Sequence, residues 1–590
     1  MRIKNYFDVL SFDFCTPLFI TRNYNYFRIP FLLKMKKIHY LHIIAFILIL
    51  SSCGERIPNS VIESNLKQEQ LLINQKEIFQ SLYSNYLTKN IYQDSITLNS
   101  QIAALYPTKE CLWSNGEILN KSAKSLISML KNAHSYGLDS SFFDLDQIVH
   151  LKNSIEKDTG NNALLEDAEW QLSKMSIEFY SAIKAGFLNH EDKDSLYFQI
   201  KYDSLKKDDI STISHCIKTN KLEEGVDSLE PQFFEFKELR KSWGNFVADR
   251  DFSHEKINVE TLKKDSVEAY KKAISALVLY GYIDTSISKT NQEIIEVLKE
   301  FQLQHGLTQD GRIGSATANA LSRSNNQRRL AAMTSIEKMK WNPIKEDTLF
   351  YANIPAYSLK VIENNKITRE YRTVVGKTIN RTPEFSAKMN YLIINPFWHL
   401  PNSISSKEVL PKLKADSNLA RKKGYKIYDK NRNVVDATKV DWSKVSQSSF
   451  NYKISQTRSG RTALGKVKFI FSNKYSIYFH DTPSKRLFKN DIRAYSHGCV
   501  RVQNPLDLAQ YMLSRQDDLM TKDSVEKFTK RGIQKKFNLN YNMMVHIRYY
   551  SCEGTAENKM IFYRDIYKKE KTVKNKIEEI IAENQNKKSL

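Results

Sequence analysis

The sequence predicts a multi-domain α+β protein, and three observations support this prediction. A chain of 590 residues is too long for one hydrophobic core. Apolar residues have helical spacing through residues 55–260 and again in a short module, 265–325. From residue 345 onward, β-branched and aromatic runs alternate with turns. With 41% hydrophobic and 11% aromatic residues, the composition is that of a folded chain rather than a disordered one.

The N-terminus predicts a processing signal. Met35-Lys36-Lys37 is basic, a short apolar run spans Leu41 to Leu50, and Leu50-Ser51-Ser52-Cys53 resembles a bacterial lipobox. Residues 35–53 are therefore expected to be a lipoprotein signal, cleaved before Cys53, whose thiol is lipidated. An uncleaved anchor is the alternative, although the run is short for a membrane helix of about 20 residues. Residues 1–34 are interpreted as a mis-assigned start, and the expected location is the periplasm, lipid-anchored to a bacterial membrane, in particular the outer membrane.

The net charge and the cysteine spacing give only weak evidence about partners and disulfide bonds. A net charge of +23 is compatible with an anionic partner, or with a Lys/Asn-rich composition spread over solvated surfaces. Arginine runs with interleaved aromatics are missing, so no nucleic-acid partner is expected. The six cysteines are scattered without a CxxC pair, and a Cys111–Cys216 bridge stays open. Neither a P-loop nor a dinucleotide fingerprint occurs, so we expect no cofactor.

Residues 55–260 are expected to form a helical domain. The clearest helix has apolar residues at alternating spacings of three and four, which line one helical face as a core stripe. Gly186 is its expected C-cap. The residues of this face are Leu165, Ala168, Leu172, Met175, Phe179 and Ala182.

Residues 265–325 form a separate small helical module. One helix ends at His305-Gly306-Leu307, Asp310-Gly311 makes a turn, and Ser315 can cap a second helix. Together with Phe301-Gln302, this pattern resembles the type-1 peptidoglycan-binding domain, a three-helix module. Such modules bind glycan or serve only as spacers.

The remainder is expected to be a mainly-β domain with an insertion. Residues 345–535 contain the β-rich runs, and 403–455 is a polar, lysine-rich insertion with weak helical patches. Residues 536–570 are a strand-like extension that completes either the helical scaffold or the β domain. The charged segment 571–590 is expected to be a solvated helix or disordered.

Two motifs in this domain point to chemistry. His480-Asp481-Thr482-Pro483 follows a strand-like run, and Ser496-His497-Gly498-Cys499-Val500-Arg501 follows it. A thiol becomes a nucleophile when a base or a positive field makes it a thiolate, and a neighbouring glycine allows amides to turn toward an oxyanion. The alternatives are an inert buried thiol and a zinc site of His480, His497 and Cys499, but no fourth ligand is evident. We therefore expect cysteine acyl transfer and no metal.

These two motifs resemble the YkuD-type L,D-transpeptidase catalytic domain. Further similarity lies in Val374-Val375-Gly376-Lys377, Arg381-Thr382-Pro383 and Asn395-Pro396-Phe397-Trp398. The helical scaffold, the 265–325 module and the final strands with Arg564-Asp565-Ile566-Tyr567 resemble the large, multi-domain branch of this family, so the resemblance covers Cys53 to about residue 570. In that branch the 403–455 insertion corresponds to a capping subdomain over the active site.

The resemblance implies roles for individual residues. Cys499 would attack the carbonyl between the third stem residue and the terminal D-alanine of a donor tetrapeptide, and an amine acceptor of a second stem would resolve the thioester as a 3→3 cross-link. His480 would be the base, Asp481 would orient it through its backbone carbonyl, and amides around Gly498 would form the oxyanion hole. Substrate-binding positions would be Arg501, His497, Tyr478 and Ser496, of which His497 could instead tune the thiol.

Other functions use the same features. Transfer of the thioester to water would make an L,D-carboxypeptidase, and transfer to a protein lysine would anchor proteins to the wall. A non-catalytic, peptidoglycan-binding lipoprotein would use only the 265–325 module. The expected partners are peptidoglycan stem peptides and a membrane reached through the lipid anchor.

Overall fold

The computed structural model describes residues 59–87, 93–190, 196–248, 250–261, 266–284, 290–456 and 462–589. The expected start, signal and lipidated Cys53 lie outside these ranges. The chain divides into two compact units, Met1–Ile73 and Asn74–Leu590, and the architecture below is that of the second. Within the described ranges, no helix combines the length and apolar character needed to span a bilayer.

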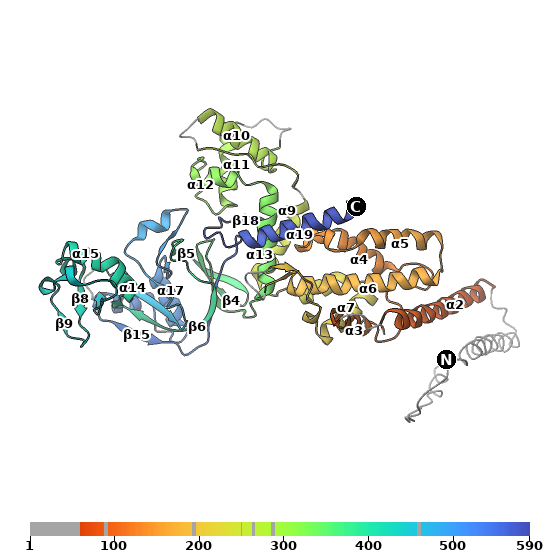
Figure 1. The fold of residues 1–590 in the computed structure, drawn as a ribbon, viewed down its shortest axis with the longest axis horizontal. Helices are drawn as coiled ribbons and strands as arrows, with labels where there is room; N and C mark the ends of the chain where they lie inside the picture. The colour runs from red at the N-terminus through yellow and green to blue at the C-terminus, as the bar shows by residue number, and fades with distance from the viewer. Residues whose placement is uncertain are drawn as a thin grey trace, which may run out of the picture. The chain divides into compact units, whose positions relative to one another are not determined.

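The multi-domain α+β class is confirmed, beginning with a helical domain (Figure 1). Its helix α6, which equals α2 in length, begins after the capping residue Asn161 and is capped at its C-terminal end by Gly186, where φ is +88°. The predicted apolar face of α6 is buried, as expected for a core stripe. The elements are α2 (Asn59–Leu82), α3 (Gln93–Ala104), α4 (Lys121–Lys131), α5 (Leu145–Lys157), α6 (Asn162–Ala185), β1 (Leu188–Asn189), β2 (Tyr197–Phe198), α7 (Lys207–Thr219), α8 (Leu222–Leu229) and α9 (Phe234–Ala248).

The small module contains three helices around its own hydrophobic core. They are α10 (Ser266–Leu279), α11 (Asn291–Leu303) and α12 (Ser315–Leu321). Gly306, with φ of +63°, follows α11 and packs against Tyr563 of the C-terminal segment. The helix α13 (Asn325–Trp341) then leaves the module and joins the core of the helical domain.

The catalytic-type domain is one large sheet that closes on itself. Its order is β11-β12-β14-β5-β4-β3-β16-β6-β15, and β11 also pairs with β6. Most neighbours are antiparallel, but β12–β14 and β3–β16 are parallel. The helix α17 packs its apolar residues into the core of this sheet. The elements are β3 (Leu349–Asn353), β4 (Ser358–Glu363), β5 (Lys366–Gly376), β6 (Phe385–Ile394), β11 (Val467–Phe471), β12 (Phe479–His480), β13 (Ala494–Ser496), β14 (Val500–Val502), α17 (Pro505–Ser514), α18 (Lys522–Arg531), β15 (Lys535–Asn538) and β16 (Met544–Arg548).

The insertion has a sheet and a core of its own, which the expectation of weak helical patches did not include. Its four-stranded sheet has the order β7-β10-β8-β9, and Trp442, Phe450 and Ile454 are buried in a separate apolar cluster. We call residues 398–456 the cap. Its elements are β7 (Trp398–His399), α14 (Asn402–Ile404), α15 (Leu410–Ala415), α16 (Leu419–Lys423), β8 (Tyr425–Tyr428), β9 (Val434–Val435) and β10 (Lys453–Gln456).

The C-terminal residues contribute to both large cores. β15 and β16 complete the catalytic sheet, whereas β17 (Cys552–Gly554) and β18 (Met560–Phe562) pack on the helical domain. The segment after 570 is a helix, as the first of the two expected alternatives predicted, but one face of this helix is buried and not solvated. It forms α19 (Lys571–Ser589), which crosses α13 and packs against it (Figure 1). Its buried residues repeat at helical spacing on one face, which explains the packing: Val573, Ile577, Ile580 and Ile581.

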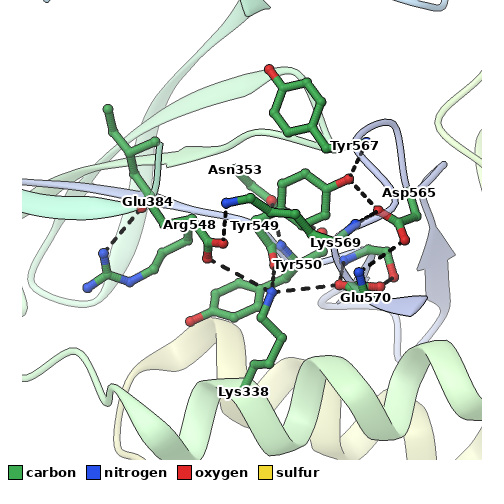
Figure 2. A network of polar contacts seen from close by, with 12 residues as sticks. Lys338, Asn353, Glu384, Arg548, Tyr549, Tyr550, Asp565, Tyr567, Lys569 and Glu570 are labelled. Atoms are coloured by element: carbon green, nitrogen blue, oxygen red, sulfur yellow. Dashed lines mark hydrogen bonds and ion pairs between the residues drawn. The ribbon is translucent and has the colours of Figure 1, made fainter. Parts of the chain in front are cut away.

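A polar network joins the C-terminal segment to α13 (Figure 2). Lys338 of α13 donates to the backbone carbonyl of Tyr549, and its ammonium group lies 4.0 Å from Glu570. The Tyr549 hydroxyl donates to Asp565 at 2.5 Å and accepts from the amide of Tyr567 at 2.8 Å. The network therefore fixes the loop that holds Tyr567.

The possible Cys111–Cys216 bridge is absent. Cys111, Cys216, Cys499 and Cys552 are all free among the described residues. The Cys111 thiol instead contacts the backbone carbonyl of Gln75 at 3.3 Å.

Candidate active site

Two parallel strands bring the motif residues to one face of the sheet. β12 pairs with β14 so that Phe479 lies beside Val500 and His480 beside Arg501. Phe479 and Val500 are buried in the sheet core. Because side chains alternate along a strand, their neighbours lie on the opposite face. The residues on that face are Tyr478, His480, Cys499 and Arg501.

The Cys499 thiol is a neutral group in this structure. Burial raises its pKa to about 11, although hydrogen bonds from the amide and side chain of Tyr478 and the charge of Arg501 act in the other direction. The thiol contacts the Ser476 carbonyl at 3.8 Å. Nucleophilic attack therefore requires that the thiol lose its proton to a base during the reaction.

His480 is held as a neutral imidazole with one free nitrogen. Its Nδ1 lies 2.5 Å from the backbone carbonyl of Asp481, so Nδ1 carries the proton and Nε2 can accept one. Burial, followed by the charge of Arg501, lowers the pKa of His480 to about 3. The Asp481 carboxylate points elsewhere, because its oxygens accept from the amides of Thr482 at 2.6 Å and Lys466 at 2.8 Å.

Two cations flank the thiol. The Nε atom of Arg501 is buried and has no hydrogen-bond partner among the described residues. Lys468 of β11 lies opposite His480 in the sheet, and its ammonium nitrogen is 5.7 Å from the centre of the Tyr478 ring. Burial lowers the pKa of both cations, while the charge of Cys499 raises it. The two side chains place positive charge near the reacting sulfur.

His497 faces the cap instead of the thiol. Its Nε2 lies 2.6 Å from the Glu408 carboxylate, which belongs to the cap segment after α14. This pair connects the loop that precedes Cys499 to the cap. Within the described ranges, no three His, Cys, Asp or Glu side chains form a metal-binding cluster.

The loop before Cys499 is held by short polar contacts. The Ser496 hydroxyl donates to the Cys499 carbonyl at 2.5 Å and accepts from the Gly498 amide at 3.1 Å. Gly498 has φ of +117°, a conformation that glycine adopts readily and other residues rarely. The Gly498 amide is therefore occupied, which leaves the Cys499 amide as the loop donor for an oxyanion. These two bonds of Ser496 stabilise the loop.

A second set of contacts reaches this loop from Tyr567 of the C-terminal segment. The Tyr567 hydroxyl donates to the Gly376 carbonyl at 2.5 Å and accepts from the Thr382 amide at 3.2 Å. The Thr382 hydroxyl accepts from the Gly376 amide at 2.9 Å and donates to the Gly498 carbonyl at 2.7 Å. Thr382 is 0% and Tyr567 1% exposed, so water does not replace these bonds. We call this set the loop brace.

Three residues of the site were missed as contributors by sequence reasoning. Lys468 lies between the apolar positions Val467 and Phe469, and strand alternation could have placed it on the face of His480. Thr382 and Tyr567 belong to the similar motifs, but no local pattern shows that they meet across 185 residues.

Comparison with known proteins agrees with this geometry. Residues 347–526 match the "L,D-transpeptidase catalytic domain" of the YkuD family. Residues 100–242 match a "Scaffold domain", and residues 265–321 match a "Putative peptidoglycan binding domain". A "Putative L,D-transpeptidase" from Haemophilus influenzae is 37% identical over 163 residues, which cover 28% of this chain and 33% of that protein. The match thus spans about a third of the relative's length.

The sheet face with its cysteine, histidine and arginine lies within the matched 347–526 segment. The helical domain and the three-helix module match the two accompanying families. The chain therefore carries a YkuD-type L,D-transpeptidase catalytic domain, joined to a scaffold domain and a type-1 peptidoglycan-binding domain.

Proposed function

We propose that this protein is an L,D-transpeptidase that forms 3→3 cross-links between peptidoglycan stem peptides through a thioester on Cys499, with release of D-alanine. The observation that supports this most directly is the pairing of β12 with β14, which places His480 beside Arg501 and close in register to Cys499, with Nδ1 of His480 bound to the Asp481 carbonyl. The catalytic-domain match supports the reaction class, and the peptidoglycan-binding match supports the substrate.

In the acylation step, His480 Nε2 takes the proton of the Cys499 thiol as the sulfur attacks the donor carbonyl. The S–C bond forms, the C–N bond to D-alanine breaks, and the proton passes to the leaving amine. The Cys499 amide donates to the oxyanion, because the Gly498 amide is bound to Ser496. In the second step the acceptor amine loses a proton to His480 and attacks the thioester, and the sulfur leaves as the thiol.

The two pKa shifts indicate that the Cys499 thiol and the His480 imidazole are both neutral before substrate binds. A thiol with pKa of about 11 beside an imidazole with pKa of about 3 is not an ion pair before substrate binds. An anionic substrate group beside Arg501 would reduce the positive field that lowers the pKa of His480, and the imidazole would become a stronger base. We propose that Arg501 and Lys468 bind a carboxylate of the donor stem in this way.

The cellular location belongs to the same proposal. Peptidoglycan lies outside the cytoplasm, so an enzyme acting on it must be exported. The lipobox-like Cys53 supports export with lipidation and a periplasmic location at a bacterial membrane.

The test is incubation of the purified chain, beginning after Cys53, with a disaccharide-tetrapeptide, followed by mass spectrometry beside a Cys499→Ala control. A cross-linked dimer with loss of D-alanine, absent from the control, is expected. Tripeptide alone would reassign the protein as an L,D-carboxypeptidase. If no product depends on Cys499, the enzymatic proposal is wrong for this substrate and a wall-binding role is favoured.

A further inference from the structure

The cap contains a cavity of about 790 Å³ that is separate from the thiol. Three cations line it, Lys430, Arg432 and Lys453, together with His399, and no carboxylate does so. A volume of this size falls within the range of about 300–1,000 Å³ typical of small-molecule sites. The cavity therefore has the size for a ligand larger than a single ion.

The charge of this cavity is only partly neutralised by the protein, because Asp429 is the one carboxylate among the described residues shown to interact with a lining cation, Lys430. Residues 401–456 contain twelve Lys and Arg against five Asp and Glu. Elsewhere in the cap, cations do find partners, as Lys422 does with Asp416 at 2.8 Å. Among the ion pairs of the described residues, none involves a cation that lines the cavity, and Asp429 beside them is bound by the turn amides of Asn431 and Asn433. Three adjacent cations with a single carboxylate, Asp429, near them leave a net positive charge, which favours an anionic ligand.

Two further features indicate a binding site rather than a solvated surface. Ser405 lines the cavity and is 1% exposed, and its buried hydroxyl has no hydrogen-bond partner among the described residues. A buried hydroxyl without a partner is costly, so a ligand that bonds to it gains free energy. The rings of Phe450 and Tyr452, 5.8 Å apart between centres, provide an apolar wall.

The cavity lies across a cap strand from the catalytic face. On β7, Trp398 and His399 point to opposite sides, because neighbours on a strand alternate. Hydrogen bonding links the Trp398 side chain to Tyr478, which in turn contacts Cys499. His399 lines the cavity on the other side. A ligand in the cavity is thus near the active site, but outside the space where the thioester forms.

We propose that this cap cavity binds a carboxylate-bearing stem peptide of peptidoglycan at a position distinct from the donor. Lys430, Arg432 and Lys453 would bind its carboxylates, and the Ser405 hydroxyl would bond to a peptide group. The inference rests on the proposed function for the choice of peptide. Its physical content, a carboxylate site in the cap, does not depend on catalysis.

The experiment compares two triple variants of the full chain after Cys53. In the first, Lys430→Gln, Arg432→Gln and Lys453→Gln neutralise the cavity. In the matched control, Lys412→Gln, Lys414→Gln and Lys439→Gln remove the same charge from exposed cap positions that do not line the cavity. Equal melting temperatures would show that both fold. The ligands are a disaccharide-tetrapeptide and the same compound with its carboxylates amidated, measured by calorimetry on a Cys499→Ala background.

We expect the cavity variant alone to lose affinity for the acidic ligand by about tenfold, as three exposed charge pairs would give. The amidated ligand should bind the parent chain and cavity variant equally weakly. Equal losses in both variants, or equal affinity for both ligands, would overturn the proposal. Because binding is measured without the thiol, failure of the cross-linking assay and failure of this site are separate results. If inorganic phosphate displaces the peptide at equal concentration, the site is a general anion site and the assignment to stem peptide is wrong.

Discussion

Replacing Tyr567 by phenylalanine removes one hydroxyl that lies far in sequence from the catalytic motif. This hydroxyl bonds to the Gly376 carbonyl and the Thr382 amide. Thr382 in turn holds the Gly498 carbonyl, next to the nucleophile. We predict that the Tyr567→Phe variant folds but reacts slowly, because the loop brace positions Cys499.

The size of the effect follows from the bonds that are lost. A buried backbone group without a partner costs about 1–3 kcal/mol, and this substitution leaves two such groups. Relaxation of the 376–382 turn recovers part of that cost, so a loss of about 2–4 kcal/mol in unfolding free energy is expected. A displacement of the nucleophile of about 1 Å can cost about 100-fold in rate. We therefore expect kcat to fall by about 10- to 100-fold with little change in KM.

The matched control is Tyr541→Phe. Its hydroxyl donates to the Met512 carbonyl at 2.9 Å in the same domain, away from the loop brace. Both variants are measured by thermal unfolding, by Cys499-dependent D-alanine release, and by the alkylation rate of the thiol with iodoacetamide. The control should lose about 1 kcal/mol of stability and keep its kcat. If Tyr567→Phe loses stability but keeps kcat within twofold, the loop brace has no positioning role.

Three further predictions concern the site itself. His480→Gln should flatten the pH dependence of unfolding free energy by up to about 1.4 kcal/mol per pH unit between about pH 6.5 and 4, measured with denaturant. Burial keeps His480 neutral in the folded parent, with a pKa of about 3. The unfolded chain therefore binds more protons than the folded chain in this pH range, and the parent loses stability as pH falls. If the variant and the parent have the same slope, His480 is not a buried neutral imidazole. Arg501→Gln should raise KM for the donor by about tenfold or more, because the half-buried cation that we propose binds a donor carboxylate is lost. An unchanged KM would exclude this contact. Glu408→Gln should speed hydrogen exchange in residues 405–415 without changing the melting temperature, because an exposed ion pair such as that with His497 contributes little to global stability. If the variant and the parent exchange at the same rate, the pair does not hold the cap in place.

The sequence was sufficient to predict the α+β class and the matched domains because their signals are local. The apolar face of α6 and the capping glycine Gly186 follow from residues within one helix. The catalytic motifs are also local, because each lies at the end of a short strand, and β12 and β14 then pair directly. Their roles in catalysis remain predictions.

Other features depend on contacts that no local pattern records. The strands of the cap are short and pair out of sequence order, so polar composition alone suggested an insertion with weak helices. In α19, charged residues obscured the apolar repeat from Val573 to Ile581, although the spacing was present. The sequence around Thr382 is that of an ordinary turn, and only the folded structure shows that its amide bonds to the Tyr567 hydroxyl.

The C-terminal segment explains why the catalytic sheet and the helical domain depend on each other. After β16 completes the sheet, the chain enters the helical core through β17, β18 and α19. Between these two parts lie Tyr549, Asp565 and Tyr567, which Lys338 of α13 ties to the helical domain (Figure 2). Tyr567 bonds to Thr382, and Thr382 bonds to the Gly498 carbonyl. A chain of hydrogen bonds therefore links the helical domain to the loop that carries the nucleophile. An excised domain ending near residue 526 would lack two strands of its sheet, β15 and β16, and also the loop brace, so its activity would not represent that of the whole chain.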